Sequence, residues 1–171
     1  MTAPTPLPYT EALLRHFTDL RDGTHGHDPA PHEHTRLGKE RLFRTTVTLL
    51  DPHARAVLAE IDTALLAGTG TVTVTAPHRT PDGGLDATWD LSWPEQRAAR
   101  VAPVRLHAFY GRTFHHPHLQ GGTVGQWPLN VFTAQQAEAE LPTLRAIASA
   151  DLHNLVYQRD HRLIPAAVSR T

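Results

Sequence analysis

The chain has 171 residues, with 16 Lys or Arg against 17 Asp or Glu, and it contains no cysteine. This length is typical of one domain that buries roughly two-thirds of its surface. The balanced charge argues against nucleic-acid and anionic-lipid partners, because phosphate binding requires clustered Lys and Arg. The sequence shows neither a signal peptide nor an apolar run of about 18 residues, so we expect a cytoplasmic protein that does not enter a membrane.

A short helix is predicted near the N-terminus. Thr10 can cap it, Gly23 can end it, and its apolar residues recur at helical spacing. We expect this face to pack on the domain or on a partner. Its members are Leu13, Leu14, Phe17 and Leu20.

Residues 21–35 are polar and rich in glycine and proline, which is typical of a poorly ordered linker. We therefore divide the chain into an N-terminal helix and linker, residues 1–35, and one domain, residues 36–171. The linker carries two His-x-His pairs, which could bind Zn²⁺, Ni²⁺ or Cu²⁺ because alternate residues of an extended segment project to one side. A disordered linker is the favoured interpretation, since a closed metal site requires an ordered scaffold. These histidines are His25, His27, His32 and His34.

Two elements are predicted between residues 36 and 68. Residues 42–50 alternate apolar and polar side chains, which favours a strand, although residues 36–44 could also begin a helix. Asp51 and Pro52 then form a typical helix start, and Gly68 a typical helix end. We expect one helix over residues 51–68.

Three strands follow, over residues 71–75, 85–93 and 104–109, each with apolar residues at every second position. Asp82, Gly83 and Gly84 form the turn before the second strand. Trp89 and Trp93 should share its buried face. The sequence thus predicts an α+β fold in which an antiparallel β-meander packs against helices. Thr133 and the residues after it predict a further helical region, interrupted at Pro142 and continuing to about residue 159.

The central motifs resemble a known family. T-P-D-G-G, a strand that ends in W-P-E, A-P-V-R-L, F-H-H-P-H-L and G-Q-W-P-L-N occur in this order within residues 71–132. In order and spacing they resemble the ubiquitin-conjugating enzyme (UBC-like) fold. That family has a proline-glycine-glycine turn, a strand ending in Phe-Pro, a His-Pro-Asn tripeptide and a Gly-x-x-Cys-Leu motif that carries the thioester cysteine. The resemblance implies a UBC-like domain that recognises a ubiquitin-like protein.

The departures from the family bear directly on chemistry. Aligning Gly125 and Leu129 with the family motif puts Pro128 at the position of the nucleophile, so thioester chemistry is excluded. His116 matches the histidine of the tripeptide. His118 stands where the family has the asparagine that stabilises the oxyanion, and an imidazole can still donate one hydrogen bond there.

Two other chemistries remain open. The first is a metal centre at His115, His116 and His118, which His107 and His153 could join; against it, Pro117 can simply fix a loop in which one imidazole is hydrogen-bonded. The second is an oxyester-forming hydroxyl at Thr123, which would require an activating base within hydrogen-bond reach.

We therefore expect a binding or scaffolding subunit of a ubiquitin-like conjugation pathway, with no cofactor. Its partners would be a ubiquitin-like protein, an activating enzyme or both, in a hetero-oligomer. A loop aromatic supplies large contact area on docking, so the expected contact residues are Phe114, Trp127 and Pro128. The alternatives are a transferase that uses a hydroxyl nucleophile and a histidine-rich metal-dependent enzyme.

Overall fold

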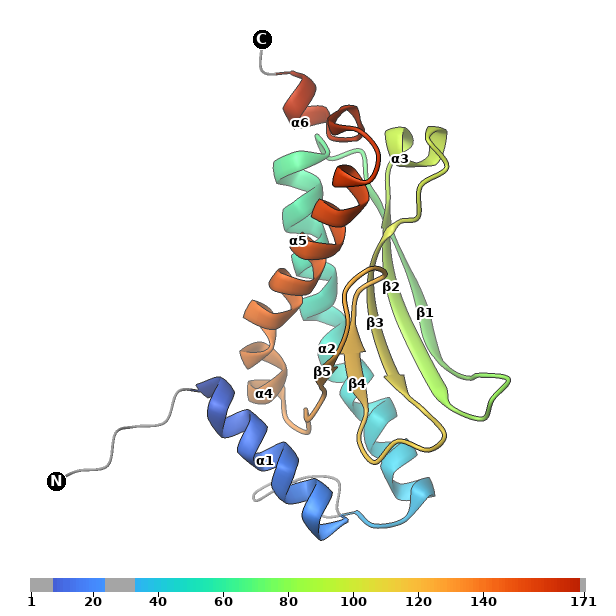
Figure 1. Cartoon of the computed structure of the whole chain (residues 1–171), viewed down its shortest axis with the longest axis vertical. Coiled ribbons are helices and arrows are strands. Elements are labelled where there is room, and N and C mark those ends of the chain that lie inside the picture. The colour runs from blue at the N-terminus through green and yellow to red at the C-terminus, as the bar shows by residue number, and fades with distance from the viewer. Residues whose placement is uncertain (1–7, 24–32, 170–171) are drawn as a thin grey trace, which may run out of the picture.

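The computed structural model describes residues 8–23 and 33–169 and shows an α+β fold (Figure 1). Its sheet is an antiparallel meander in which each strand pairs with the next one along the chain. This arrangement confirms the predicted antiparallel meander. The strands are β1 (Thr71–Arg79), β2 (Leu85–Ser92), β3 (Val104–Tyr110), β4 (His118–Gln120) and β5 (Trp127–Pro128).

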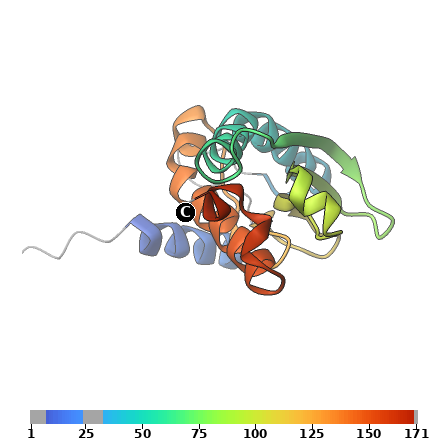
Figure 2. The same cartoon turned by 90° about the horizontal axis from the view of Figure 1, so that it is seen from above.

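Helices cover one side of this sheet. Two of them, α2 and α5, lie together against it in both views (Figures 1 and 2). The α-helices are α1 (Pro8–Asp22), α2 (Arg36–Leu65), α3 (Pro94–Ala98), α4 (Ala134–Ala139), α5 (Leu141–Tyr157) and α6 (Pro165–Val168), with the 3-10 helix η1 (His161–Leu163) before α6. Among the residues in this description, no helix is long and apolar enough to cross a membrane.

The core lies between the sheet and these helices. Along β2 and β3, every second side chain is buried and those between them are half-buried, as the period-2 pattern predicts. Trp89 and Trp93 are both fully buried, which confirms that they face the core. Their indoles are also hydrogen-bonded: Nε1 of Trp89 donates to Oδ1 of Asp51 (2.8 Å), and Nε1 of Trp93 donates to the backbone O of Leu163 (2.6 Å).

The strand predicted at residues 42–50 is wrong. These residues belong to α2, which runs through Pro52 without a break, so Asp51 is not a helix cap. The helix begins instead after Thr35, whose side chain accepts a hydrogen bond from the backbone N of Gly38 (3.0 Å). The buried residues recur at helical spacing across the whole segment: Phe43, Val47, Leu50, Ala54, Val57, Leu58 and Ile61.

The other helix boundaries agree better with the sequence. The helix α2 ends just before Ala67 and Gly68, which both adopt positive φ (57° and 70°). Thr133 and Gln136 form the predicted capping box of α4. However, α1 begins at Pro8, so Thr10 lies in its first turn and is not its cap. Most of the predicted linker, including His25, His27 and His32, lies outside the described residues.

A histidine cluster between α1 and the loop after β3

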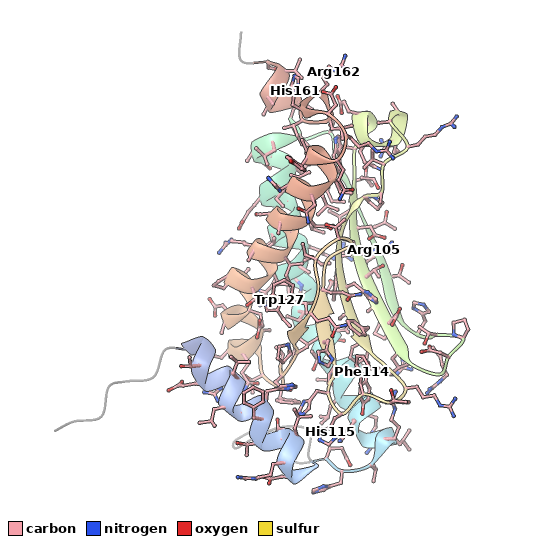
Figure 3. All side chains as sticks on the ribbon, viewed as in Figure 1. Arg105, Phe114, His115, Trp127, His161 and Arg162 are labelled. Atoms are coloured by element: carbon pink, nitrogen blue, oxygen red, sulfur yellow. The ribbon has the colours of Figure 1, made fainter. Side chains whose placement is uncertain are left out.

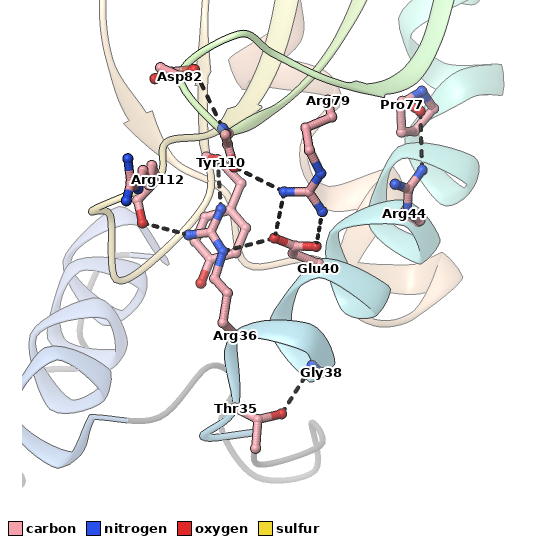
Figure 4. Close-up of polar contacts among 12 residues, drawn as sticks. Thr35, Arg36, Gly38, Glu40, Arg44, Pro77, Arg79, Asp82, Tyr110 and Arg112 are labelled. Atoms are coloured by element: carbon pink, nitrogen blue, oxygen red, sulfur yellow. Dashed lines mark hydrogen bonds and ion pairs between the residues drawn. The ribbon is translucent and has the colours of Figure 1, made fainter.

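The loop of residues 111–117, between β3 and β4, is held by the first turn of α2 (Figure 4). Nη1 of Arg36 donates to the backbone O of Gly111 (2.9 Å) and of Arg112 (3.1 Å), and its guanidinium lies 3.8 Å from the centre of the Tyr110 ring. Nε of Arg36 also donates to Glu40 (3.0 Å). The loop is thus fixed to the helix that forms much of the core.

Glu40 links the same corner to β1. It accepts from Nη2 of Arg79 (2.6 Å) as well as from Arg36, and only 7% of the residue is exposed (Figure 4). The hydrogen bond from Arg79 is the largest cause that lowers the pKa of Glu40, and the bond from Arg36 adds to it, while burial opposes both. Glu40 therefore remains charged at neutral pH, and its ion pairs join α2 to β1 at this corner.

Within the loop, His116 is a buried, structural residue. It is 1% exposed, and its Nδ1 lies 3.0 Å from Oδ1 of Asn130, to which it donates. The backbone N of Leu129 donates to the backbone O of Pro117 (3.0 Å), so the loop is also tied to the end of β5. His116 thus fixes the loop to the segment that follows it.

The helix α1 lies against this loop by its polar face. Nε2 of His115 donates to the backbone O of Asp19 (2.9 Å), and Nζ of Lys39 donates to the backbone O of Gly23 (3.3 Å). Oδ2 of Asp19 lies 3.8 Å from Nε2 of His116. Asp19 is 2% exposed. Figure 3 shows His115 between the loop and α1.

Four imidazoles meet at this contact, which we call the histidine cluster: His16 of α1 with His115, His116 and His118. The ring centroid of His16 lies 4.7 Å from that of His116 and 6.1 Å from that of His118. The rings of His115 and His116 are 5.1 Å apart. The cluster lines a hollow of about 330 Å³, together with Leu20, Phe114 and Gln126.

Burial favours the neutral form of two imidazoles in the cluster, His16 and His118. It lowers the pKa of His16, an effect that Asp19 opposes and His115 reinforces. Burial also lowers the pKa of His118, and the neighbouring His16 lowers it further, while a hydrogen bond to the backbone of His116 opposes both. Nδ1 of His16 and Nδ1 of His118 are buried and have no hydrogen-bond partner within residues 8–23 and 33–169. A proton added at either Nδ1 atom would therefore find no acceptor among these residues.

The predicted metal sites find no geometric support in the part of the chain that the structure describes. No group of three or more His, Asp or Glu side chains there is arranged to hold a metal ion. His34 is exposed. His107 contacts Gln120 and Asp86 on the outer face of the sheet, and the His153 ring stacks on that of Tyr157 in α5. These two histidines thus take part in contacts other than those of the cluster.

The three predicted contact residues lie in different settings. Phe114 is 37% exposed, and its ring packs against His118 (centroids 5.1 Å apart) and Phe109 (5.7 Å). Trp127 is half-buried and packs against the core (Figure 3). Pro128 is half-buried in β5, opposite His118. Of the three, Phe114 presents the most accessible apolar surface.

Thr123 lies on the tip of the turn between β4 and β5, and its hydroxyl is anchored. Its Oγ1 donates to Oδ1 of Asp151 (2.6 Å) and accepts from Nδ2 of Asn154 (3.1 Å). Asp151 is fully buried and also accepts from the backbone N of Thr123 (2.6 Å) and of Arg105 (2.9 Å). A carboxylate with these three donors stabilises the turn. Asp151 was not predicted as a buried residue, although it is a charged residue on an apolar helix face.

The outer face of α1 is apolar. Its large side chains are exposed, with exposed fractions from 43% to 67%, and Leu20 among them also borders the hollow of the histidine cluster. The predicted apolar face thus exists, but it is not covered by the described part of the chain. It consists of Leu13, Leu14, Phe17 and Leu20.

Comparison with known proteins adds no relative. A scan against protein-family models, a search of curated proteins and a search of solved structures each found no match.

Proposed function

We propose that this protein is a non-covalent binding subunit for a ubiquitin-like protein or for the activating enzyme of its conjugation pathway. The proposal combines the motif resemblance to ubiquitin-conjugating enzymes with the absence of cysteine. The order of a long helix, an antiparallel meander, a histidine-proline loop and C-terminal helices is compatible with it. Pro128, at the nucleophile position, offers no reactive group.

The observation that carries a binding role is the exposed apolar surface of α1 and the adjoining loop. Four large apolar side chains of one helix face outward, and Leu20 among them lines the same hollow as Phe114. The apolar face of α1 therefore continues onto the loop. Apolar surface of this extent on a soluble domain is typical of a protein-protein contact. Phe17 and Phe114 are its aromatic members, and such residues often dominate binding energy.

The geometry favours binding over hydroxyl transfer. Of the two hydroxyls nearest the position of the family's nucleophile in the sequence, Thr133 caps α4, and Thr123 is held by Asp151 and Asn154. If the Thr123 hydroxyl left these hydrogen bonds to act as a nucleophile, the buried Asp151 would have fewer donors, which costs free energy. The structural role of Thr123 thus competes with any role as a nucleophile.

The test is a titration of the purified protein with the ubiquitin-like protein and, separately, with its activating enzyme. We expect reversible binding, weakened at least about tenfold by Phe17→Ser and by Phe114→Ser. The matched control is Tyr157→Ser, because Tyr157 is 84% exposed on α5, away from this surface. Equal affinity of all variants, or no binding at all, would refute the proposed function.

A second arm addresses covalent chemistry. The protein is incubated with the activating enzyme, ATP and the ubiquitin-like protein, and the products are separated on a denaturing gel. We expect no covalent adduct. An alkali-labile adduct that disappears in Thr123→Ala would instead establish the hydroxyl-transfer alternative.

A further inference from the structure

The contact between α1 and the domain is unusual in its polarity. An amphipathic helix normally buries its apolar side, whereas α1 turns Asp19 and His16 inward and its leucines outward. The described contacts that hold it are polar: the bonds from His115 and Lys39 to backbone oxygens, and the packing of His16 on His116. Burial of leucine side chains thus contributes little to this docking.

Every charged group that faces this contact can be named. From α1 there is Asp19, whose charge favours protonated neighbours. From α2 there is Lys39, a cation whose own pKa is lowered mainly by burial and which Asp19 and Glu33 support. From the loop and β4 come His115, His116 and His118, and Nε2 of His116 lies 3.8 Å from Oδ2 of Asp19. Asp19 is thus the carboxylate that could compensate the charge of a protonated histidine, and it already interacts with the charge of Lys39.

We propose that α1 is a proton-released helix, docked on the loop while the histidine cluster is neutral and released when His16 and His118 become charged. The inference rests on the geometry of the cluster: His16 and His118 are half-buried, and their Nδ1 atoms are buried without a hydrogen-bond partner in the described residues. The ring centroid of His16 lies 4.7 Å from that of His116 and 6.1 Å from that of His118. Release would separate Leu20 from Phe114 and so divide the proposed binding surface. It therefore adds regulation to the proposed function.

The direction of the pH dependence follows from linkage. Docking lowers the pKa of both imidazoles, whereas in the released state they regain an ordinary pKa near 6.5. The released state therefore binds more protons, and docking weakens as the pH falls through about 6.5. Below that pH, each histidine can lower the ratio of docked to released protein by up to about tenfold per pH unit, and the two together by up to about a hundredfold.

The experiment exploits the absence of cysteine in the chain. Leu14→Cys on α1 and Ala59→Cys on α2 introduce two exposed labelling sites for a fluorescent donor and acceptor. Energy transfer is measured from pH 8 to pH 5, with tryptophan fluorescence as the reading of the folded core. We expect transfer to fall with a midpoint near pH 6 while the tryptophan signal stays constant.

Histidine variants in the labelled protein identify the groups responsible. His16→Gln should halve the steepness of the transition, and His16→Gln combined with His118→Gln should abolish it. The matched control is His161→Gln, because His161 is exposed at the opposite end of the molecule (Figure 3). The His161→Gln variant should show the same pH dependence of energy transfer as the parent protein.

Three results would overturn the inference. They are a constant transfer efficiency from pH 8 to pH 5, an unchanged transition in the double histidine variant, and a tryptophan signal that is lost together with the transfer. The assay contains no partner protein. Its failure would therefore leave the proposed binding function standing, and a failure to bind a partner would leave this result unaffected.

Discussion

At the scale of single residues, Trp89 combines two stabilising roles. It is fully buried, and its indole donates to Asp51 in α2, so it joins the sheet to the main helix. We expect Trp89→Ala to lower the free energy of unfolding by about 3–5 kcal/mol, as large-to-small core changes do. Trp89→Phe keeps most of the apolar volume and should cost about 1 kcal/mol through the lost hydrogen bond. Urea denaturation measures both, and a loss below about 1 kcal/mol for Trp89→Ala would show a poorly packed site.

Asp151 is the second residue with a testable role. Its carboxylate accepts two backbone N–H groups and the Thr123 hydroxyl inside the protein. Asp151→Asn replaces one acceptor oxygen by a donor amide, so we expect a loss of about 1–3 kcal/mol in the free energy of unfolding. Thr123→Ala removes only the hydroxyl and should cost less. A larger effect of Thr123→Ala than of Asp151→Asn would contradict this assignment.

The sequence indicated the buried side chains of the strands but not these partners. The alternation in β2 predicts that Trp89 faces inward, because strand geometry alone determines it. The hydrogen bond from the Trp89 indole to Asp51 could not be predicted in this way. It depends on how α2 crosses the sheet, and no local sequence pattern determines that crossing. The same holds for His116: the Pro117 motif predicts a fixed loop, whereas the bond to Asn130 depends on the path of the chain after β5.

At the scale of elements, α2 contains a proline within its length. Pro52 has no N–H to donate to the preceding turn, and its ring crowds that turn. We expect Pro52→Ala to raise the free energy of unfolding by about 1–2 kcal/mol, less than the full helix-interior penalty because proline also restricts the unfolded chain. The control is Ala56→Pro, an exposed position one turn later, which should cost about 3 kcal/mol or more. Destabilisation by Pro52→Ala would show that the surrounding structure requires the proline.

The same proline explains the main error in the sequence analysis. Asp-Pro is a common helix start, and residues 42–50 alternate, so local signals favoured a strand followed by a helix. The buried residues Phe43, Val47 and Leu50 fit a helical face equally well. Packing of this face against the sheet and α5 outweighs the local cost of Pro52.

At the scale of the whole molecule, α1 shows what periodicity can and cannot predict. The spacing of its leucines correctly indicates that they share a face of a helix. It does not indicate whether the chain itself covers that face, and the described residues leave it exposed. The inward polar face was not predicted, because the contacts of His16 and Asp19 are made with loop histidines that are distant in the sequence.

The stability of the whole domain should fall on mild acidification, and His107 provides the clearest test. Only 17% of its side chain is exposed, and burial lowers its pKa despite the opposing charge of Asp86. His107 therefore binds a proton more readily in the unfolded chain than in the folded domain. His107 can remove up to about 1.4 kcal/mol of stability for each pH unit below 6.5, until its folded-state pKa is reached.

Urea unfolding at pH 7.5 and at pH 5.5 measures this loss. We expect His107→Gln to reduce it, whereas the control His78→Gln, at an exposed position of β1, should leave it unchanged. Glu140 acts in the opposite direction, because burial raises its pKa and favours the folded state at low pH. A parent protein that is more stable at pH 5.5 than at pH 7.5 would show that Glu140 outweighs the histidines.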